Sequence, residues 1–320
     1  MSLPRLEQRI LKSVSRSFYL SIRFLPREVR SPIGLAYLLA RTSDTIADTE
    51  SAPAGTRIRR LDEFGDLVRG QGSPSALTSI QRDIEPTHPG ERELIAALPR
   101  LMEAYSASEM WDWNETGALM ANIIRGQRND LQTFSDTPQI VALKNASELD
   151  DYIYLVAGCV GEWWTRVCCH HLTNYSAVPE AELTPAANSF GKALQLVNIL
   201  RDLPADLAAG RCYLPADELA AHGVEPEDLR QTPTLAQPVA DAWLARARAL
   251  LEKGKTYIGA VRVRRVRFAC YLPWRLAGRT LDLLEQQSPL AAGTKLKVPR
   301  SEVRAALWNG LGVAFLNRAF

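Results

Sequence analysis

Residues 33–48 read IGLAYLLARTSDTIAD, and this stretch is strongly helical in pattern. Its apolar residues recur at the three- and four-residue spacing of an α-helix and cover most of the helix surface. Two carboxylates, Asp44 and Asp48, stand four residues apart, so they project from the same face about one turn apart. Charged groups on so apolar a helix are costly unless they face a cavity. The stretch therefore predicts a helix with a charged rim on an apolar pocket.

A second acidic pair has the same spacing. Asp202 and Asp206 flank Pro204, which predicts that this pair lies where a helix ends or is distorted. An isolated pair is usually a solvated helix face, but Arg41 precedes the first pair and Arg201 the second. Adjacent carboxylates repel unless a cation neutralises them, and Mg²⁺ commonly bridges carboxylates to substrate phosphates. Arginine binds phosphate through two parallel hydrogen bonds, so we expect a magnesium and phosphate site.

The remaining chain also indicates helices. The expected helical ranges are 5–18, 31–40, 91–113, 115–132, 148–170, 185–203, 239–257 and 262–285. The only strand candidate is 295–298, and residues 204–238 are expected to be the least structured part of the chain. Neither a repeat nor a low-complexity linker interrupts the 320 residues. We therefore predict one all-α domain over residues 1–320.

Composition excludes several classes of protein. The 38 Lys and Arg against 36 Asp and Glu leave a net charge of +2, which gives no support for a nucleic-acid partner. No segment approaches the roughly 18 uninterrupted apolar residues that a membrane helix needs. The five cysteines lack a CxxC pair and the N-terminal stretch lacks a secretory apolar run, so we expect a cytoplasmic protein. Four arginines within residues 262–267 indicate either a solvated helix face or a peripheral membrane contact.

An apolar pocket with a charged rim fits a ligand that is anionic at one end and apolar along its length. An isoprenoid diphosphate has this character. Its chemistry requires that cations draw off the diphosphate and that the resulting allylic cation is shielded from water.

Five motifs then carry a family resemblance. They are 15–18 (SRSF), 37–48 (YLLARTSDTIAD), 156–161 (VAGCVG), 195–202 (QLVNILRD) and 210–215 (GRCYLP). In this order they resemble the squalene/phytoene synthases, the head-to-head prenyltransferases, over most of the chain. The resemblance is strongest to bacterial squalene synthases. It implies a single all-α domain of the isoprenoid-synthase fold with a central apolar cavity.

The resemblance also implies a set of site residues, assigned by motif position. The Mg²⁺ ligands would be Asp44, Asp48, Asp202 and Asp206. The diphosphate-binding residues would be Arg16, Arg41, Arg201, Arg211, Tyr37, Gln195 and Asn198. A basic element of Lys295, Lys297 and Arg300 matches the proposed NADPH region of squalene synthases, although a solvated loop explains it equally well.

Two positions depart from the family pattern. Ala205 stands where relatives usually carry an acidic residue, which removes one charge from the second pair. Leu155 stands where many members have a tyrosine before the VAG motif. Dehydrosqualene-synthase-like members place an aromatic residue one position earlier, so the resemblance assigns Tyr154 a role near the cation or in proton handling.

The implied reaction joins two molecules of farnesyl diphosphate through presqualene diphosphate, and NADPH then reduces the product to squalene. Without reduction, the alternatives are a dehydrosqualene synthase, a phytoene synthase, or a relative that forms presqualene diphosphate or hydroxysqualene. The sequence leaves open the C15 or C20 donor and the oligomeric state. A head-to-tail elongase or terpene cyclase is disfavoured because Ser43 precedes Asp44 and Arg201 precedes Asp202, where elongases have DDxxD. Two alternatives belong to other functional classes. A helical phosphohydrolase of the His-Asp type needs a histidine followed by aspartate, and none of the four histidines is followed by one. A non-catalytic assembly partner would predict a broken acidic pair, whereas both pairs are intact.

Overall fold

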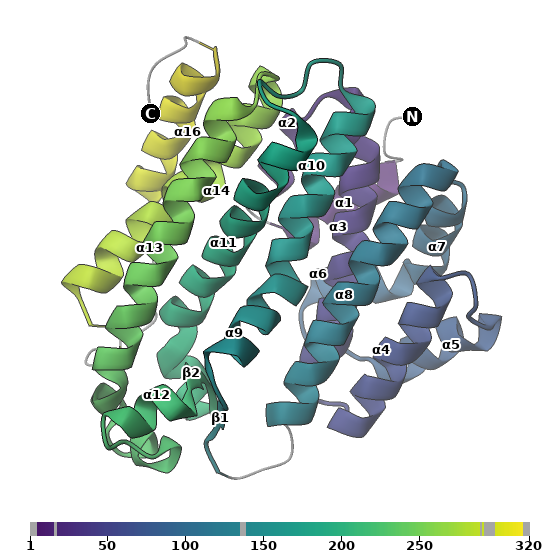
Figure 1. Cartoon of the computed structure of the whole chain (residues 1–320). Coiled ribbons are helices and arrows are strands. Elements are labelled where there is room, and N and C mark those ends of the chain that lie inside the picture. The colour runs from purple at the N-terminus through teal and green to yellow at the C-terminus, as the bar shows by residue number, and fades with distance from the viewer. Residues whose placement is uncertain (1–4, 16–17, 135–138, 289, 291–297, 316–320) are drawn as a thin grey trace. The chain divides into compact units, whose positions relative to one another are not determined.

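The computed structural model describes residues 5–15, 18–134, 139–288, 290 and 298–315, and most of them are helical (Figure 1). The predicted all-α class is confirmed. The chain divides into two compact units. Unit 1 comprises Met1–Ser135 and Arg166–Thr173, and unit 2 comprises Asp136–Thr165 and Asn174–Phe320. None of the described helices is both long enough and apolar enough to cross a membrane. That residues 1–320 form a single domain stays a prediction.

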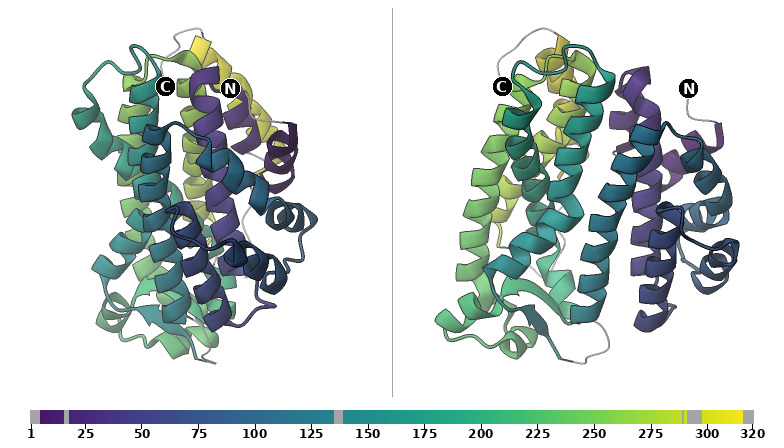
Figure 2. Two further views of the ribbon diagram at one scale, coloured as in Figure 1. Left: turned by 90° about the vertical axis from the view of Figure 1, so that its right-hand side faces the viewer. Right: turned by 45° about the vertical axis from the view of Figure 1, so that its right-hand side comes forward.

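Unit 1 is organised around helix α3. In chain order its helices are α1 (Arg5–Val14), α2 (Phe18–Phe24), α3 (Arg27–Asp48), α4 (Ala54–Val68), α5 (Pro74–Asp83), α6 (Pro89–Ala96), α7 (Leu98–Ser106) and α8 (Met110–Phe134). Helices α3, α4 and α8 pack against one another, and α6 and α7 also contact α3 (Figure 2). Leu38, Leu39 and Ile46 of α3 are completely buried, as is Phe64 of α4. The apolar stretch that opened the sequence argument is therefore the core of this unit.

Two of the differences between predicted and observed helices in unit 1 involve proline. Helix α3 begins at Arg27 and continues through Pro32, so the predicted start at residue 31 was wrong. Pro32 lies in the second turn, where its missing N–H removes one hydrogen bond near the helix end. The predicted helix 91–113 is divided among α6, α7 and the start of α8. Pro99 lies in the first turn of α7, where a fixed φ favours a new helix.

Unit 2 is organised around helix α11. Its elements are β1 (Val141–Leu143), α9 (Ala146–Ile153), the π-helix η1 (Tyr154–Gly158), the first part of α10 (Cys159–His171), α11 (Glu180–Ala208), β2 (Arg211–Pro215), α12 (Ala216–Ala221), η2 (Pro226–Arg230), η3 (Pro233–Ala236), α13 (Gln237–Ala260), α14 (Arg264–Gln286) and α16 (Arg300–Phe315). Helix α11 packs against α13, α14 and η1, and α16 packs along α14 (Figure 1).

The strand prediction and the loop prediction in this unit were incomplete. Strands β1 and β2 form a parallel pair in which Val141 is opposite Arg211 and Ala142 is opposite Cys212. Strands this short contain too few residues for an alternating pattern, so they could not be recognised from the sequence. Residues 295–297 of the predicted strand lie outside the described residues. The expected loop 204–238 instead contains the end of α11, β2, α12, η2 and η3.

Helix α11 lies unusually close to η1 and α10 because two glycines occupy the crossing. A Cβ atom on Gly191 would lie 2.2 Å from the carbonyl oxygen of Ala157. One on Gly161 would lie 2.1 Å from the carbonyl oxygen of Ala187. No side chain fits at such distances, so glycine is required at both positions. Residue 191 of α11 lies against residue 157, and residue 187 lies against residue 161. The two segments therefore run in opposite directions.

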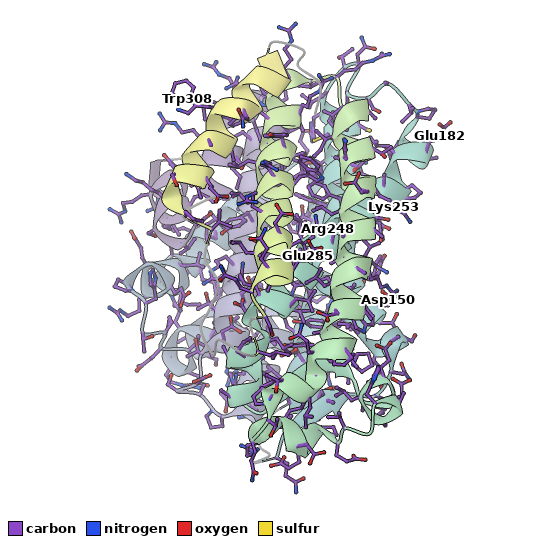
Figure 3. The ribbon with its side chains drawn as sticks, turned by 90° about the vertical axis from the view of Figure 1, so that its left-hand side faces the viewer. Asp150, Glu182, Arg248, Lys253, Glu285 and Trp308 are labelled. Atoms are coloured by element: carbon purple, nitrogen blue, oxygen red, sulfur yellow. The ribbon has the colours of Figure 1, made fainter. Side chains whose placement is uncertain are left out.

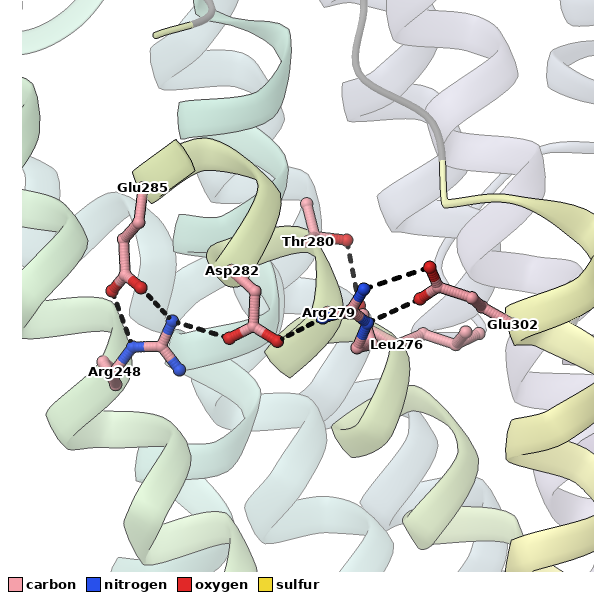
Figure 4. Close-up of polar contacts among 7 residues, drawn as sticks. All are labelled: Arg248, Leu276, Arg279, Thr280, Asp282, Glu285 and Glu302. Carbon is pink, nitrogen blue, oxygen red and sulfur yellow. Dashed lines mark hydrogen bonds and ion pairs between the residues drawn. The ribbon is translucent and has the colours of Figure 1, made fainter. Parts of the chain in front are cut away.

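Ion pairs connect α13, α14 and α16 (Figure 4). Arg248 of α13 donates from Nε to Glu285 Oε1 at 2.8 Å and from Nη2 to Asp282 Oδ1 at 3.1 Å. Arg279 of α14 pairs with Asp282 at 2.8 Å and with both carboxylate oxygens of Glu302 of α16, at 2.5 and 3.0 Å. Figure 3 shows Arg248 and Glu285 side by side on the outer face of this unit. Solvent-accessible pairs of this kind contribute about 1 kcal/mol or less each, so these contacts add modestly to the packing of α16 on α14.

We expect Gly191→Ala to lower the free energy of unfolding by about 2–3 kcal/mol, because the added methyl group overlaps the Ala157 carbonyl and forces the helices apart. Gly259→Ala in α13 is the matched control, since nothing lies within 4 Å of its added Cβ. Alanine is favoured over glycine inside a helix by up to about 1 kcal/mol, so the control is expected to be neutral or stabilised. Denaturant unfolding followed by circular dichroism measures both. An unchanged midpoint for Gly191→Ala would contradict the close crossing.

Candidate active site

Helix α3 positions the first acidic pair in its last two turns. Asp44 and Asp48 both lie within α3, and Asp48 is its final residue, so the predicted one-turn spacing is confirmed. Tyr37 lies two turns earlier on the same helix. Burial raises the pKa of Tyr37, and a hydrogen bond with Ser15 acts in the opposite direction. This contact brings the SRSF motif against α3, although Arg16 itself lies outside the described residues.

Asp44 is held by two partners from different helices. Gln127 of α8 donates from Nε2 to Asp44 Oδ1 at 2.6 Å. Arg41 Nη1 lies 3.7 Å from Asp44 Oδ2, and the same guanidinium pairs with Glu91 of α6. Neither Gln127 nor Glu91 could be predicted as a partner from the sequence, because Gln127 lies 83 residues from Asp44 and Glu91 lies 50 residues from Arg41. We call Arg41, Asp44, Asp48, Glu91 and Gln127 the first acidic site.

The electrostatics of the first acidic site favour a bound cation. Burial, followed by the charge of Asp48, raises the pKa of Asp44 to about 6, while Arg41 and Gln127 act in the opposite direction. The Asp44 side chain nevertheless keeps 44% of its surface exposed, so a ligand can reach it. A divalent cation placed between two repelling carboxylates would remove the cause of the shift.

Two buried atoms of the first acidic site are available to a ligand. Arg41 Nε and Gln127 Oε1 have no hydrogen-bond partner among the residues that the structure describes. An unsatisfied buried polar atom costs about 1–3 kcal/mol. The first atom is a cationic donor suited to a phosphate oxygen, and the second is an acceptor suited to a metal-bound water.

Helix α11 positions the second acidic pair near its end. Arg201 donates to both carboxylate oxygens of Asp202, at 3.1 and 2.7 Å. Arg211, the first residue of β2, donates to Asp206 Oδ1 at 3.0 Å. The helix continues four residues beyond Pro204 to Ala208, so the proline does not end it, although the predicted position near the helix end is confirmed. We call Arg201, Asp202, Asp206 and Arg211 the second acidic site.

The other predicted ligands fall into three groups. Gln195 lies seven residues before Asp202 on α11 and therefore on the same helix face, whereas Asn198 is exposed. Arg300 is the first residue of α16. Lys295 and Lys297 lie outside the described residues, as Arg16 does.

The donor atoms at the acidic sites fit Mg²⁺, which keeps water and phosphate ligands, better than they fit a metal whose ligands are all protein side chains. Within the described ranges, no three His, Cys, Asp or Glu side chains are grouped closely enough to hold a metal ion by themselves. Each acidic site instead offers two carboxylates one helical turn apart. Mg²⁺ is usually bound by one or two carboxylates together with waters and phosphate oxygens. This chemistry matches a metal that arrives with a diphosphate.

Tyr154 lies in η1, within unit 2, and has two polar neighbours. Its hydroxyl donates to Glu162 Oε2 at 3.4 Å, and Lys192 Nζ lies 5.8 Å from the ring centroid. Leu155, the alternative family position, is buried in the core with 6% exposure. Sequence reasoning did not single out Glu162 or Lys192. Their positions next to the motifs are a signal that could have identified them: Glu162 directly follows motif 156–161, and Lys192 lies three residues before motif 195–202.

We expect the contribution of Asp44 to the stability of the metal-free protein to fall as the pH rises from 4 to 6. The folded pKa of Asp44, about 6, exceeds the value of about 3.9 in an unfolded chain, so the folded state binds the proton more tightly. The stabilisation from that proton is complete below pH 4 and is lost above pH 6. The melting temperature of Asp44→Asn relative to wild type should therefore increase over this range. Asp62→Asn, at an exposed pair with Arg128, is the control, and a difference between wild type and Asp44→Asn that does not change with pH would contradict the prediction.

Comparison with known proteins places these features in a family. The pattern that defines the family described as squalene/phytoene synthase matches residues 11–302. A phytoene synthase from Thermus thermophilus is 30% identical over 270 residues, which cover 82% of this chain and 76% of that protein. A bifunctional lycopene cyclase/phytoene synthase from Aspergillus oryzae is 27% identical over 314 residues. The match covers 95% of this chain but 50% of the Aspergillus protein, so the chain spans about half the length of that relative.

The fold agrees with the sequence comparison. The structure of TcSQS with a bound ligand superposes with a TM-score of 0.77 at 23% identity and covers 96% of this chain and 85% of that one. The predicted isoprenoid-synthase fold is therefore confirmed. A signature match across residues 11–302, together with the two acidic sites, leads to one conclusion: this chain belongs to the squalene/phytoene synthase family of head-to-head isoprenoid synthases.

Proposed function

We propose that the chain condenses two molecules of farnesyl diphosphate head to head, through presqualene diphosphate, and that NADPH reduces the product to squalene. One observation carries the proposal. Each unit presents two carboxylates one helical turn apart, with at least one arginine paired to them. The family acts on prenyl diphosphates, and this arrangement suits their anionic end.

The arginines have two roles that follow from charge balance. In the ligand-free protein, Arg41, Arg201 and Arg211 neutralise the carboxylates beside them. Mg²⁺ held by Asp44, Asp48, Asp202 and Asp206 would supply Lewis-acid stabilisation of the departing diphosphate. Once a cation neutralises the carboxylates, the guanidinium groups can turn their donors to diphosphate oxygens. Arg41 already presents one buried donor, Nε, that no described residue accepts.

The proposed chemistry balances without an external oxidant. The C1–O bond of one farnesyl diphosphate breaks and its electron pair leaves with the diphosphate. The C2–C3 double bond of the second substrate attacks the allylic cation, and loss of a proton closes the cyclopropane ring of presqualene diphosphate. A second ionisation and rearrangement follow. Hydride transfer then gives squalene, and we assign Tyr154 to the proton-handling step.

A phytoene synthase is the second candidate, and the named relatives favour it. The proteins from Thermus thermophilus and Aspergillus oryzae are both named for phytoene synthase activity. That reaction would use two C20 diphosphates and end in proton loss in place of reduction. Dehydrosqualene formation would end in the same way with C15 substrates, and capture of the cation by water would give hydroxysqualene.

Product analysis distinguishes these reactions. Purified protein is incubated with Mg²⁺ and farnesyl or geranylgeranyl diphosphate, with and without NADPH, and the organic extract is examined by mass spectrometry. We expect squalene from farnesyl diphosphate only when NADPH is present. An unreduced C30 product that ignores NADPH would replace squalene synthase with dehydrosqualene synthase. A C40 product from geranylgeranyl diphosphate alone would establish phytoene synthase, and no product from either would refute the proposed function.

We expect Asp44→Asn and Asp202→Asn each to lower kcat by about a hundredfold or more, because each removes a charge that holds the metal and diphosphate. Chelation of divalent metal should have the same effect on wild type, and added Mg²⁺ should restore the rate. Asp62→Asn removes one carboxylate from an exposed pair and should keep the wild-type rate. Circular dichroism checks that each variant is folded. A wild-type rate in either acidic-site variant would disprove the metal assignment.

A further inference from the structure

A second polar cluster lies in unit 2, where α10, α11 and η1 meet. We call Tyr154, Glu162, Asn188 and Lys192 the Tyr154 cluster. Its members come from η1, α10 and α11, and each is half-buried. Tyr154 begins the π-helix, a departure from α-helical geometry that is frequent at functional sites. The cluster shares no residue with either acidic site.

Glu162 is the centre of the Tyr154 cluster. Asn188 donates from Nδ2 to Glu162 Oε1 at 2.6 Å. The Tyr154 hydroxyl donates to the other oxygen, Oε2, at 3.4 Å. The amide therefore fixes one oxygen of the carboxylate, and the second oxygen is left facing the phenol.

The backbone of this region allows the side chains to converge. A Cβ atom on Gly158 would lie 3.1 Å from both Tyr154 Cδ2 and Lys192 Cγ, and 3.4 Å from Asn188 Oδ1. The absence of a side chain there leaves the space that these three groups occupy. The close contacts at Gly161 and Gly191 hold α10 and η1 against α11 next to the cluster.

Lys192 places a positive charge in the cluster. Its ammonium lies 5.8 Å from the Tyr154 ring centroid, within the range of a cation–π contact. On α11, Asn188, Lys192 and Gln195 follow one another at four- and three-residue spacing. Asp202 and Asp206 continue the same helix face. The Tyr154 cluster and the second acidic site are thus the two ends of one polar stripe on α11.

We propose that Glu162, oriented by Asn188, positions the Tyr154 hydroxyl and accepts its proton in the step that closes the cyclopropane ring. The proposal rests on the proposed function above. In that step a substrate C–H bond breaks and its electron pair forms the new ring bond. The proton passes to the phenol oxygen of Tyr154 while the phenol's own proton passes to Glu162 Oε2. Tyr154 ends neutral, and Glu162 becomes a carboxylic acid that later releases its proton to water.

The test compares Glu162→Gln, Tyr154→Phe and the double variant. We expect Glu162→Gln and Tyr154→Phe each to lower kcat by about a hundredfold with KM changed by less than about threefold, since proton transfer typically contributes at least that factor. Because the two residues act as one unit, the double variant should lose little more than either single variant. Glu162→Asp, which keeps a carboxylate, should retain more activity than Glu162→Gln.

Glu218→Gln is the matched control, because Glu218 is a half-buried carboxylate of the same unit that accepts a hydrogen bond from the Trp243 indole at 2.7 Å. It should keep kcat within about twofold. A wild-type kcat in Glu162→Gln would overturn the proposal. So would losses that multiply in the double variant, or a Glu162→Asp rate no better than that of Glu162→Gln.

A measurement independent of activity separates this inference from the proposed function. Melting temperatures of wild type, both single variants and the double variant form a cycle for the Tyr154–Glu162 contact. Non-additive losses support the positioning of Tyr154 by Glu162, and additive losses overturn it. If wild-type protein forms no product from either prenyl diphosphate, the proposed function and the proton transfer both fail. The positioning contact is then judged by this cycle alone.

Discussion

Neutralisation of paired carboxylates is the constraint on which both acidic sites depend. Two carboxylates one turn apart repel each other unless a nearby cation or hydrogen-bond donor offsets their charge. Each site therefore contains cations and donors, some of them from other elements. Gln127 of α8 and Arg41 contact Asp44, and Arg211 of β2 contacts Asp206. Because α8 and β2 lie beside these helix ends, Gln127 and Arg211 can offset the negative charge of Asp44 and Asp206.

Close backbone packing is the second constraint, and it acts within unit 2. The crossing of α11 with η1 and α10 is possible only because Gly161 and Gly191 carry no side chain. The same crossing brings Asn188 within 2.6 Å of Glu162. The π-helix at Tyr154 interrupts regular α-helical geometry at this point. The π-helix begins at Tyr154, whose hydroxyl is the only phenol group used in the proposed reaction.

The success and failure of the sequence argument follow from the range of each interaction. Helical periodicity is a local property, so the α-helical class and the one-turn spacing of Asp44 and Asp48 were predicted correctly. Proline predicts helix ends less reliably than its missing N–H would suggest. Pro32 and Pro204 lie near helix ends, where one lost hydrogen bond is tolerated, and both helices continue through them. Strands β1 and β2 were missed because three to five residues carry no readable alternation.

Spacing along the chain is enough to identify the residues that share a helix face and the family that the motifs resemble, so both could be read from the sequence. The partners of those residues became known only from the folded structure. Gln127 reaches Asp44 across 83 residues, and Glu91 reaches Arg41 across 50. Asn188 holds Glu162 across 26 residues. Hydrogen bonds depend on distance and direction in space, and local periodicity contains no information about either once the chain has turned back on itself.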